Sequence, residues 1–202
     1  MSKPSEAQTN VENLNNGQRW FALRVKSRSE KVVATMAANK GFEEFLPVYQ
    51  CRRRWSDRLK QVELPLFPGY VFCRLNPQCR LPLLTIPGVL YFVGLGKTPV
   101  PLEDAEIAAI QAAVRSDLST EPWPYLETGD RIVLTEGPLT GVEGILIGAA
   151  KQDRLIVSVT LLKRSIAVTI DRNWAVPLDG NGLPLDLRVR PFLANLMNPA
   201  GA

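Results

Sequence analysis

The stretch that decides the fold is Leu66-Phe67-Pro68-Gly69-Tyr70-Val71-Phe72. A proline followed by a glycine favours a tight turn, because proline fixes its own φ angle and glycine accepts left-handed backbone. The aromatic and β-branched residues after the turn favour a strand. Along such a strand, Tyr70 and Phe72 point to one face and Val71 points to the other. The stretch therefore predicts a turn that leads into an aromatic-rich strand.

Further strands are expected on both sides of this one. Residues 20–25 and 42–48 are short apolar-rich runs, and residues 89–93 follow a second proline–glycine turn in Thr85-Ile86-Pro87-Gly88-Val89. Residues 50–63 are polar and basic without apolar periodicity, which indicates an extended hairpin or loop.

Helices are expected between these strands. The first begins after Ser29, whose hydroxyl is expected to cap it, and ends at Gly41. A short helix is expected over 77–84, and a longer one over 103–117, with acidic residues in its first turn. The apolar face of the first helix is expected to hold Val32, Val33, Met36 and Ala37. That of the last is expected to hold Ile107, Ile110 and Val114. The element order predicts an α+β fold, in which helices pack on a largely antiparallel sheet.

The second half of the chain has a different texture. Short β-branched runs separated by turns fill residues 127–178, which predicts a small SH3-like β-barrel. One of the turns, Glu136-Gly137-Pro138-Leu139-Thr140-Gly141-Val142-Glu143-Gly144, holds three glycines. The predicted domains are thus 19–117 and 127–178. Residues 118–126, with Pro122 and Pro124, are expected to be a semi-stiff linker, and residues 1–18 and 179–202 are expected to be tails.

Composition narrows the class of function. Residues 19–117 hold 15 Lys and Arg against 9 Asp and Glu, whereas residues 127–178 hold 6 of each, so the basic character belongs to the first domain. The chain has no histidine, and Cys51, Cys73 and Cys79 form no C-x-x-C pair. We therefore expect no enzyme, no metal site and no cofactor. The free thiols indicate a reducing cytoplasmic compartment, and the lack of a long apolar run predicts no membrane span.

The ordered set of motifs resembles the NusG family of transcription elongation and antitermination factors, including its paralogue RfaH. The resemblance rests on Leu66–Phe72, on Thr85–Val89, and on the glycine-rich turn within a barrel that looks like a KOW module. The opening Trp20-Phe21-Ala22-Leu23 also resembles the family's first strand. The resemblance covers about residues 19–178 and implies a NusG-type N-terminal α/β sandwich followed by a KOW barrel.

The resemblance implies a surface for RNA polymerase. In this family the N-terminal domain docks on the clamp helices of the β′ subunit through apolar residues. The matching positions are Leu23, Phe67, Tyr70 and Phe72. An aromatic anchor on a rigid strand offers much contact area and loses little entropy. Phe67 and Tyr70 are expected to be exposed, although a plain core role for these rings is the alternative.

The resemblance also implies a contact with the non-template DNA strand, because family members bridge the polymerase cleft. The candidate cations lie in the basic hairpin and near the first strand: Lys26, Arg28, Arg52, Arg53, Arg54, Arg58 and Lys60. Arginine and lysine bind phosphates, and the interleaved Trp55 can stack on an unpaired base. The alternative for these residues is a solvated charged hairpin.

In the barrel, the resemblance places a partner site at Leu161, Leu162 and Arg164, where NusG contacts Rho or the ribosomal protein NusE. NusG commonly has an aromatic, a glycine and an arginine there, whereas this chain has Leu162 and Lys163 before Arg164. An exposed leucine pair is expected. The change weakens the case for Rho more than for the ribosome.

Two subtypes and one other class stay open. Residues 63–67 and the altered barrel tip favour a specialised antiterminator over a housekeeping NusG that acts in pausing and Rho-dependent termination. A monomer is expected. The β-branched runs 156–160 and 168–170 predict a barrel instead of the helical hairpin that RfaH can form. KOW modules also occur in ribosomal RNA-binding proteins, but the charge-neutral barrel argues against that class.

Overall fold

The computed structural model describes residues 17–55, 58–126, 129–148 and 153–185, and the side chains of 52–60 lie outside this description. By backbone contacts the chain divides into unit 1, Met1–Pro47 with Phe67–Asp104, and unit 2, Val48–Leu66 with Ala105–Ala202. The tail predictions for residues 1–16 and 186–202 fall outside the described residues. The predicted α+β class with a β-rich C-terminal part is confirmed.

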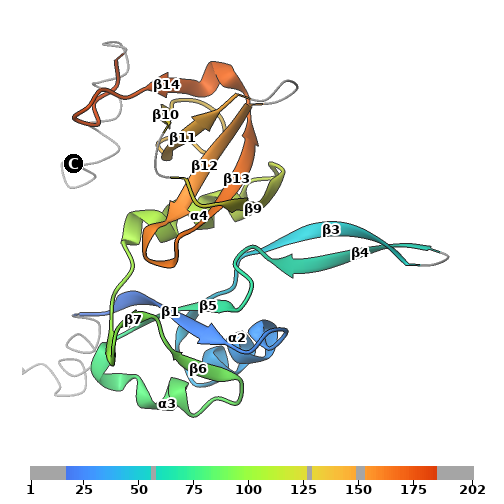
Figure 1. Ribbon diagram of the computed structural model, residues 1–202, viewed down its shortest axis with the longest axis vertical. Coiled ribbons are helices and arrows are strands. Elements are labelled where there is room, and N and C mark those ends of the chain that lie inside the picture. Colours follow the sequence, from blue (N-terminus) through green and yellow to red (C-terminus); the bar gives the residue numbers. More distant parts are fainter. Residues whose placement is uncertain (1–16, 56–57, 127–128, 149–152, 186–202) are drawn as a thin grey trace, which may run out of the picture. The chain divides into compact units, whose positions relative to one another are not determined.

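Unit 1 is built on a four-stranded antiparallel sheet (Figure 1). Its order is β2 (Glu43–Phe45), β5 (Tyr70–Leu75), β1 (Arg19–Val25) and β6 (Val89–Phe92). The central pair sets Leu23 opposite Val71. Directly opposed residues share a face, so the alternating apolar residues of both strands form one continuous apolar surface.

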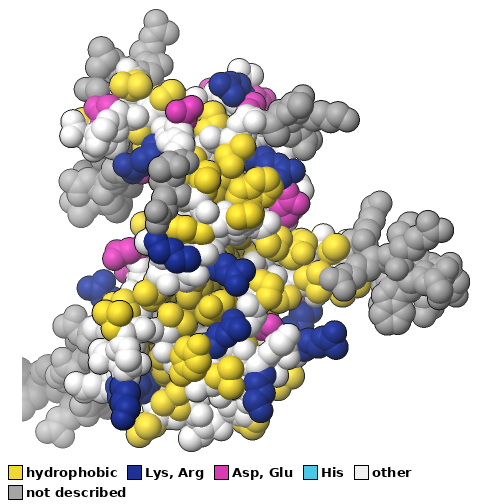
Figure 2. Space-filling view, in the orientation of Figure 1, with side chains coloured by type: hydrophobic (Ala, Val, Ile, Leu, Met, Phe, Trp, Pro, Cys, Tyr) yellow, Lys and Arg dark blue, Asp and Glu magenta, His cyan; other side chains and the backbone are white. Residues whose placement is uncertain are grey.

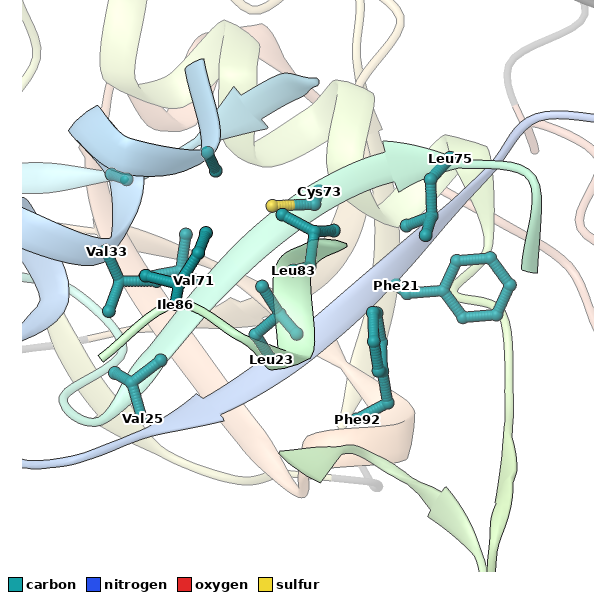
Figure 3. Close-up of a cluster of buried hydrophobic side chains, with 12 residues drawn as sticks. Phe21, Leu23, Val25, Val33, Val71, Cys73, Leu75, Leu83, Ile86 and Phe92 are labelled. Carbon is teal, nitrogen blue, oxygen red and sulfur yellow. The ribbon is translucent and has the colours of Figure 1, made fainter. Parts of the chain in front are cut away.

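Helices α2 (Glu30–Asn39) and α3 (Leu81–Leu84) cover this surface (Figure 3). The side chains in the figure converge from β1, β5 and β6 and from both helices, and burial of this apolar area is the main favourable contribution to folding. The buried core consists of Phe21, Leu23, Val25, Val33, Ala34, Ala37, Val71, Cys73, Leu75, Leu83, Ile86 and Phe92.

The helices differ in detail from the prediction. Ser29 makes no side-chain cap hydrogen bond, because its own backbone is already in the right-handed helical region, where the hydroxyl does not meet the first free N–H groups. Val32 is 57% exposed, and Ala34 occupies the buried face in its place. The helix predicted over 77–84 is two pieces, the 3-10 turn η1 (Pro77–Cys79) and α3, since Pro82 fits the first turn of a new helix.

Two small hairpins add to the units. In unit 1, β7 (Gly94–Leu95) pairs with β8 (Thr98–Pro99), which the sequence pattern did not predict. In unit 2, β3 (Val48–Trp55) pairs with β4 (Arg58–Pro65), which confirms the predicted hairpin.

Helix α4 (Asp104–Arg115), also in unit 2, confirms the helix predicted over 103–117. Ile107, Ile110 and Ala113 are its buried residues.

The rest of unit 2 is the predicted barrel (Figure 1). Its sheet order is β14 (Ala175–Pro177), β10 (Asp130–Leu134), β11 (Glu143–Ile147), β12 (Asp153–Val159), β13 (Arg164–Ile170) and β9 (Thr120–Pro124). The 3-10 turns η2 (Thr160–Leu162) and η3 (Arg172–Trp174) connect strands, and β12 ends at Val159. Leu155, Ile166 and Val168 are fully buried, and Leu139 of the glycine-rich turn is 1% exposed.

Strand β9 corrects the predicted linker over 118–126. The Thr169 N–H donates to the Ser119 carbonyl at 2.9 Å, so residues 119 and 169 form a hydrogen-bonded pair of the β9–β13 ladder. Such pairs alternate in an antiparallel ladder, and therefore Pro122 and Pro124 occupy non-hydrogen-bonded positions, with their nitrogens directed away from β13. A proline is acceptable at the outer side of an edge strand, where no donor is needed.

Candidate functional site

The second face of the unit 1 sheet carries a cluster of aromatic rings. Phe67 and Phe72 meet edge to face with ring centroids 5.5 Å apart, and Phe45 lies 6.1 Å from Phe72. Trp20 meets Phe45 edge to face at 6.4 Å. Phe67, Phe72 and Trp20 are buried, whereas Phe45 is half-buried. The cluster gives this face a rigid aromatic base.

The predicted exposure of Phe67 is therefore wrong, since its side chain is 1% exposed. The turn before β5 folds the ring back against Phe72, and two aromatic rings in this geometry attract each other. The prediction that Leu23 belongs to the polymerase-binding surface is also wrong. It lies opposite Val71 in register and belongs to the helix-covered core, on the face away from Phe72.

Tyr70 belongs to a row of three polar-tipped side chains across the sheet. Arg24 lies directly opposite Tyr70 on β5 and opposite Tyr91 on β6. The Arg24 guanidinium lies 4.8 Å from the centre of the Tyr70 ring, a cation–π stack. Tyr70 and Arg24 are half-buried, and Tyr91 is 56% exposed. The row is therefore more accessible than Trp20, Phe67 and Phe72 of the aromatic cluster beside it.

The two proline–glycine turns meet at the end of β1. The carbonyl of Gly69 accepts from the Val25 N–H at 2.9 Å, and that of Gly88 accepts from the Lys26 N–H at 2.8 Å. The Gly69 N–H donates to the Glu30 carboxylate at 2.8 Å, and Glu30 is buried. Gly69 has φ +82°, and a β carbon there would lie 2.5 Å from Arg24 Nη1. The position therefore favours glycine both for its backbone angle and for the close approach of Arg24.

This junction fixes a basic turn between β1 and α2. Lys26 and Arg28 are exposed, and the Ser29 N–H donates to the Lys26 carbonyl at 3.0 Å. Arg28 has φ +66°, a left-handed conformation that is costly for a residue with a β carbon. Figure 2 shows Lys and Arg side chains spread among hydrophobic ones over unit 1.

The hairpin β3–β4 supplies the remaining candidate cations. Its backbone register sets Arg53 opposite Lys60, Arg54 opposite Leu59, and Arg52 opposite Gln61. Positively charged residues thus line both strands of one extended hairpin. The side chains of Arg52, Arg53, Arg54, Arg58 and Lys60 lie outside the described part of the structure.

The thiol of Cys73 is closed to chemistry. Burial, and secondly the charge of Glu44, raise the pKa of Cys73 to about 12. Glu44 lies opposite Cys73 in register, and desolvation raises the pKa of its carboxyl group. Because the thiolate is the reactive form, this cysteine acts as a core residue. Within the described residues no group of His, Cys, Asp and Glu side chains could hold a metal ion, and no helix is long and apolar enough to cross a bilayer.

A comparison with family models matches residues 18–111 to the model described as "Transcription termination factor nusG". This range contains the aromatic face, both proline–glycine turns and the basic hairpin. Over residues 18–111 the chain is similar to the NusG family.

Curated relatives extend the similarity into the barrel. NusG of Campylobacter jejuni is 27% identical over 139 residues, which cover 63% of this chain and 78% of the relative. NusG of Rickettsia felis is 25% identical over 171 residues, 78% of this chain and 89% of the relative. Both are described as transcription termination/antitermination proteins. A solved structure of Thermotoga maritima NusG is 23% identical, with a TM-score of 0.48, and covers 78% of this chain and 96% of that chain.

The barrel tip differs from the expected leucine pair. Leu162 is 7% exposed, so its predicted exposure is wrong, because the turn η2 directs it into the barrel core. Leu161 is half-buried and Arg164 is exposed at the start of β13. Lys163 has φ +50°, and its Nζ lies 4.5 Å from the centre of the Tyr125 ring and 3.4 Å from the phenol oxygen. The accessible groups of the tip are therefore cations.

Sequence reasoning missed three residues of these surfaces. Arg24 and Tyr91 join Tyr70 only through strand register, which the alternation of single strands does not reveal. Glu30 was not singled out from the sequence. Its position at the start of a helix, directly after Ser29, was a clue, because carboxylates there often accept free N–H groups. The N–H group that it accepts belongs instead to Gly69, which is distant in the sequence.

Proposed function

We propose that this chain is a specialised NusG paralogue that binds RNA polymerase through its N-terminal domain, 19–117, and recruits a second protein through its KOW barrel, 127–178. The observation that carries the proposal is the accessible Tyr70–Arg24–Tyr91 row beside a rigid aromatic cluster. The partner surface expected from the family is the clamp-helix pair of the β′ subunit. Such a factor acts as a monomer in the cytoplasm.

The row is suited to hold a pair of helices. The Tyr70 ring is already fixed by its stack with Arg24, so little side-chain entropy is lost on binding. Tyrosine and arginine are the residue types that most often dominate binding energy at interfaces. Phe67 and Phe72 support this face from below, and Leu23 supports the sheet from the core. In this proposal Tyr70 is the direct contact, while Phe67, Phe72 and Leu23 are supporting residues.

The basic turn and the hairpin are proposed to contact the non-template DNA strand. Lys26 and Arg28 are exposed, and the strained backbone of Arg28 is of the kind that persists where surrounding structure enforces it for function. Binding through phosphates weakens steeply with salt. Replacing Arg52, Arg53 and Arg54 with alanine is therefore expected to reduce the salt dependence of binding to a single-stranded DNA probe. An unchanged salt slope would contradict the DNA contact.

The barrel tip supports a specialised role over a housekeeping one. Lys163 occupies a left-handed position where NusG commonly has glycine, and its side chain is stacked on Tyr125. With Leu162 buried, Arg164 and the neighbouring backbone are what the tip offers to NusE or to Rho. Transcription in vitro distinguishes the subtypes: we expect read-through of pauses without stimulation of Rho-dependent termination. Stimulation by Rho as strong as that of a housekeeping NusG would favour the alternative.

Pull-down of RNA polymerase tests the central proposal. Tyr70→Ala is expected to reduce bound polymerase at least about tenfold, which corresponds to about 1.4 kcal/mol. The matched control is Leu95→Ala, which removes a large exposed side chain, 79% accessible, outside the row. Polymerase binding by Tyr70→Ala equal to that of Leu95→Ala would refute the proposed surface. Copurification with ribosomes and without polymerase would instead support the ribosomal RNA-binding alternative.

A further inference from the structure

The segment 119–125, called the strap below, is held on the barrel by one face of its extended chain. Glu121, Trp123 and Tyr125 alternate along it, so their side chains share a face. Arg154 forms an ion pair with Glu121, and its guanidinium lies 4.9 Å from the centre of the Trp123 ring. Lys163 lies over the Tyr125 ring. Glu121, Trp123 and Tyr125 thus each meet a cation of the barrel.

The other positions of the strap face solvent. Pro122 and Pro124 are exposed, and their nitrogens point away from β13. A second strand therefore finds no N–H donor at these positions on the outer side of β9, and the strap ends the sheet there. Its pairing with β13 is complete in spite of the prolines, because both occupy positions that need no donor toward β13. The sequence of the strap fits an edge strand on this side of the barrel.

The strap is also weakly anchored. Among residues 119–125 every residue is either half-buried or exposed. The side chains of Glu121 and Arg154 keep 47% and 28% of their accessible surface, and pairs this exposed contribute little. By contrast, β13 beneath the strap is buried from Ser165 to Val168. The side chains of the strap therefore hold it to the barrel only weakly.

The edge beneath the strap begins at the partner-binding tip. Arg164 is both the first residue of β13 and the partner of Pro124 in the ladder. Lys163, which precedes it, touches Tyr125. When the strap leaves, β13 exposes a row of unpaired backbone groups next to Arg154, Lys163 and Arg164. An open antiparallel edge of this kind binds an extended peptide by strand addition.

We infer that the strap is a displaceable in-cis strand, which occupies on β13 the edge that an extended segment of the barrel's protein partner takes. This inference rests on the proposed recruiting role of the barrel. The strap itself indicates the chemistry of that segment: a carboxylate, then aromatic side chains at every second position, to meet Arg154 and Lys163. The strap competes with this segment and sets the threshold for recruitment, because a tethered strand has a high effective concentration.

A peptide titration tests the inference directly. The probe is a fluorescein-labelled peptide of residues 118–126, Leu-Ser-Thr-Glu-Pro-Trp-Pro-Tyr-Leu. The full chain with Glu121→Ala and Trp123→Ala is expected to bind it at least about tenfold more tightly than the unmodified chain, since the tethered competitor is weakened. The control chain Pro122→Ala, which changes the outer side of the strap, is expected to bind as the unmodified chain does. Equal affinity of the unmodified and the doubly substituted chain would overturn the inference.

Two further arms show that the peptide takes the same edge in a folded barrel. Adding Arg154→Ala to the doubly substituted chain is expected to weaken peptide binding, and undiminished binding would also overturn the inference. Amide exchange at Thr169 is expected to accelerate in the doubly substituted chain and to slow again with peptide, while Val157 in the core strand β12 stays protected. Fast exchange at Thr169 that peptide leaves unchanged counts against the inference.

The polymerase pull-down keeps this test apart from that of the proposed function. The doubly substituted chain retains Tyr70, Arg24 and Tyr91, so it is expected to bind polymerase as the unmodified chain does. If it does so and yet binds the peptide no better than the unmodified chain, only the strap inference fails. If Tyr70→Ala leaves polymerase binding intact while the peptide behaves as expected, only the polymerase surface fails.

Discussion

Replacing Gly69 with alanine perturbs the junction of the two proline–glycine turns and Arg24. Alanine at φ +82° is strained, at a cost of about 1–2 kcal/mol. Its β carbon would also lie 2.5 Å from Arg24 Nη1, so the guanidinium has to move off the Tyr70 ring. Loss of that stack costs about 0.5–1 kcal/mol at a partly exposed site. The expected loss of unfolding free energy is therefore about 1.5–3 kcal/mol.

Gly41 provides a matched control within unit 1. It has the same φ of +82°, and a β carbon there meets nothing within 4 Å. Gly41→Ala is therefore expected to cost the backbone strain alone, about 1–2 kcal/mol. The difference between the two variants isolates the displacement of Arg24.

Urea unfolding measures both variants. Of the four tryptophans, Trp55, Trp123 and Trp174 are replaced with phenylalanine, so that the buried Trp20 reports on unit 1. In an Arg24→Ala background the guanidinium is absent, and Gly69→Ala is expected to cost only about 1–2 kcal/mol, as Gly41→Ala does.

The refuting result is an unchanged cost. If Gly69→Ala destabilises the Arg24→Ala chain and the parent chain equally, within about 0.3 kcal/mol, the close approach of Arg24 plays no part. The polymerase pull-down adds a functional readout. Gly69→Ala is expected to weaken binding more than Gly41→Ala at equal folded fraction, because only the former displaces Arg24 from Tyr70.

The remaining predictions concern thiol reactivity, pH and the barrel tip. Iodoacetamide at about pH 8 is expected to modify the exposed Cys79 and to spare Cys73, which is buried and whose pKa of about 12 keeps it protonated. Mass spectrometry that finds both cysteines modified at similar rates would contradict this. Burial raises the pKa of Glu44, so the folded chain holds that proton more tightly than the unfolded chain and loses stability as pH rises through the carboxyl range. Glu44→Gln is expected to gain stability over the unmodified chain between about pH 4 and about pH 7, by under about 1 kcal/mol because the Glu44 side chain is only half-buried. A pH-independent difference in urea midpoint would argue against this. Leu162→Ala is expected to lower the free energy of unfolding by about 2–4 kcal/mol, and Leu161→Ala by less than half of that, since only Leu162 is buried. Equal melting temperatures of the two variants would contradict the burial of Leu162.

The sequence allowed the elements of both units to be predicted where a local pattern decides them. Alternation along Tyr70, Val71 and Phe72 correctly divides that strand between two faces, because a strand has a period of two whatever it packs against. The runs of the barrel between Asp130 and Ile170 are strands for a similar reason, since β-branched residues fit a half-buried pleated surface.

What the sequence pattern missed depends on contacts between distant residues. The strap reads as a linker because Pro122 and Pro124 exclude most strands, and only the register with β13 shows that both prolines sit where no donor is needed. The exposure of Phe67 was predicted wrongly for the same kind of reason. The turn before β5 folds the Phe67 ring back against Phe72, and the local pattern does not reveal this contact. Leu23 was assigned to the wrong face because alternation fixes which residues share a face, and not which face meets the helices.

The proline–glycine motifs that led to the family are structural parts of the candidate surface. The carbonyls of Gly69 and Gly88 accept hydrogen bonds from the consecutive amides of Val25 and Lys26, so two distant turns fix the end of a single strand. That end positions Arg24 on one side and the basic turn with Arg28 on the other. Among the described residues, Arg28 and Lys163 are the non-glycine residues with positive φ, and both lie at candidate contact sites. Since such strain persists only where surrounding structure enforces it, the motifs hold the backbone while their polar neighbours offer the contacts.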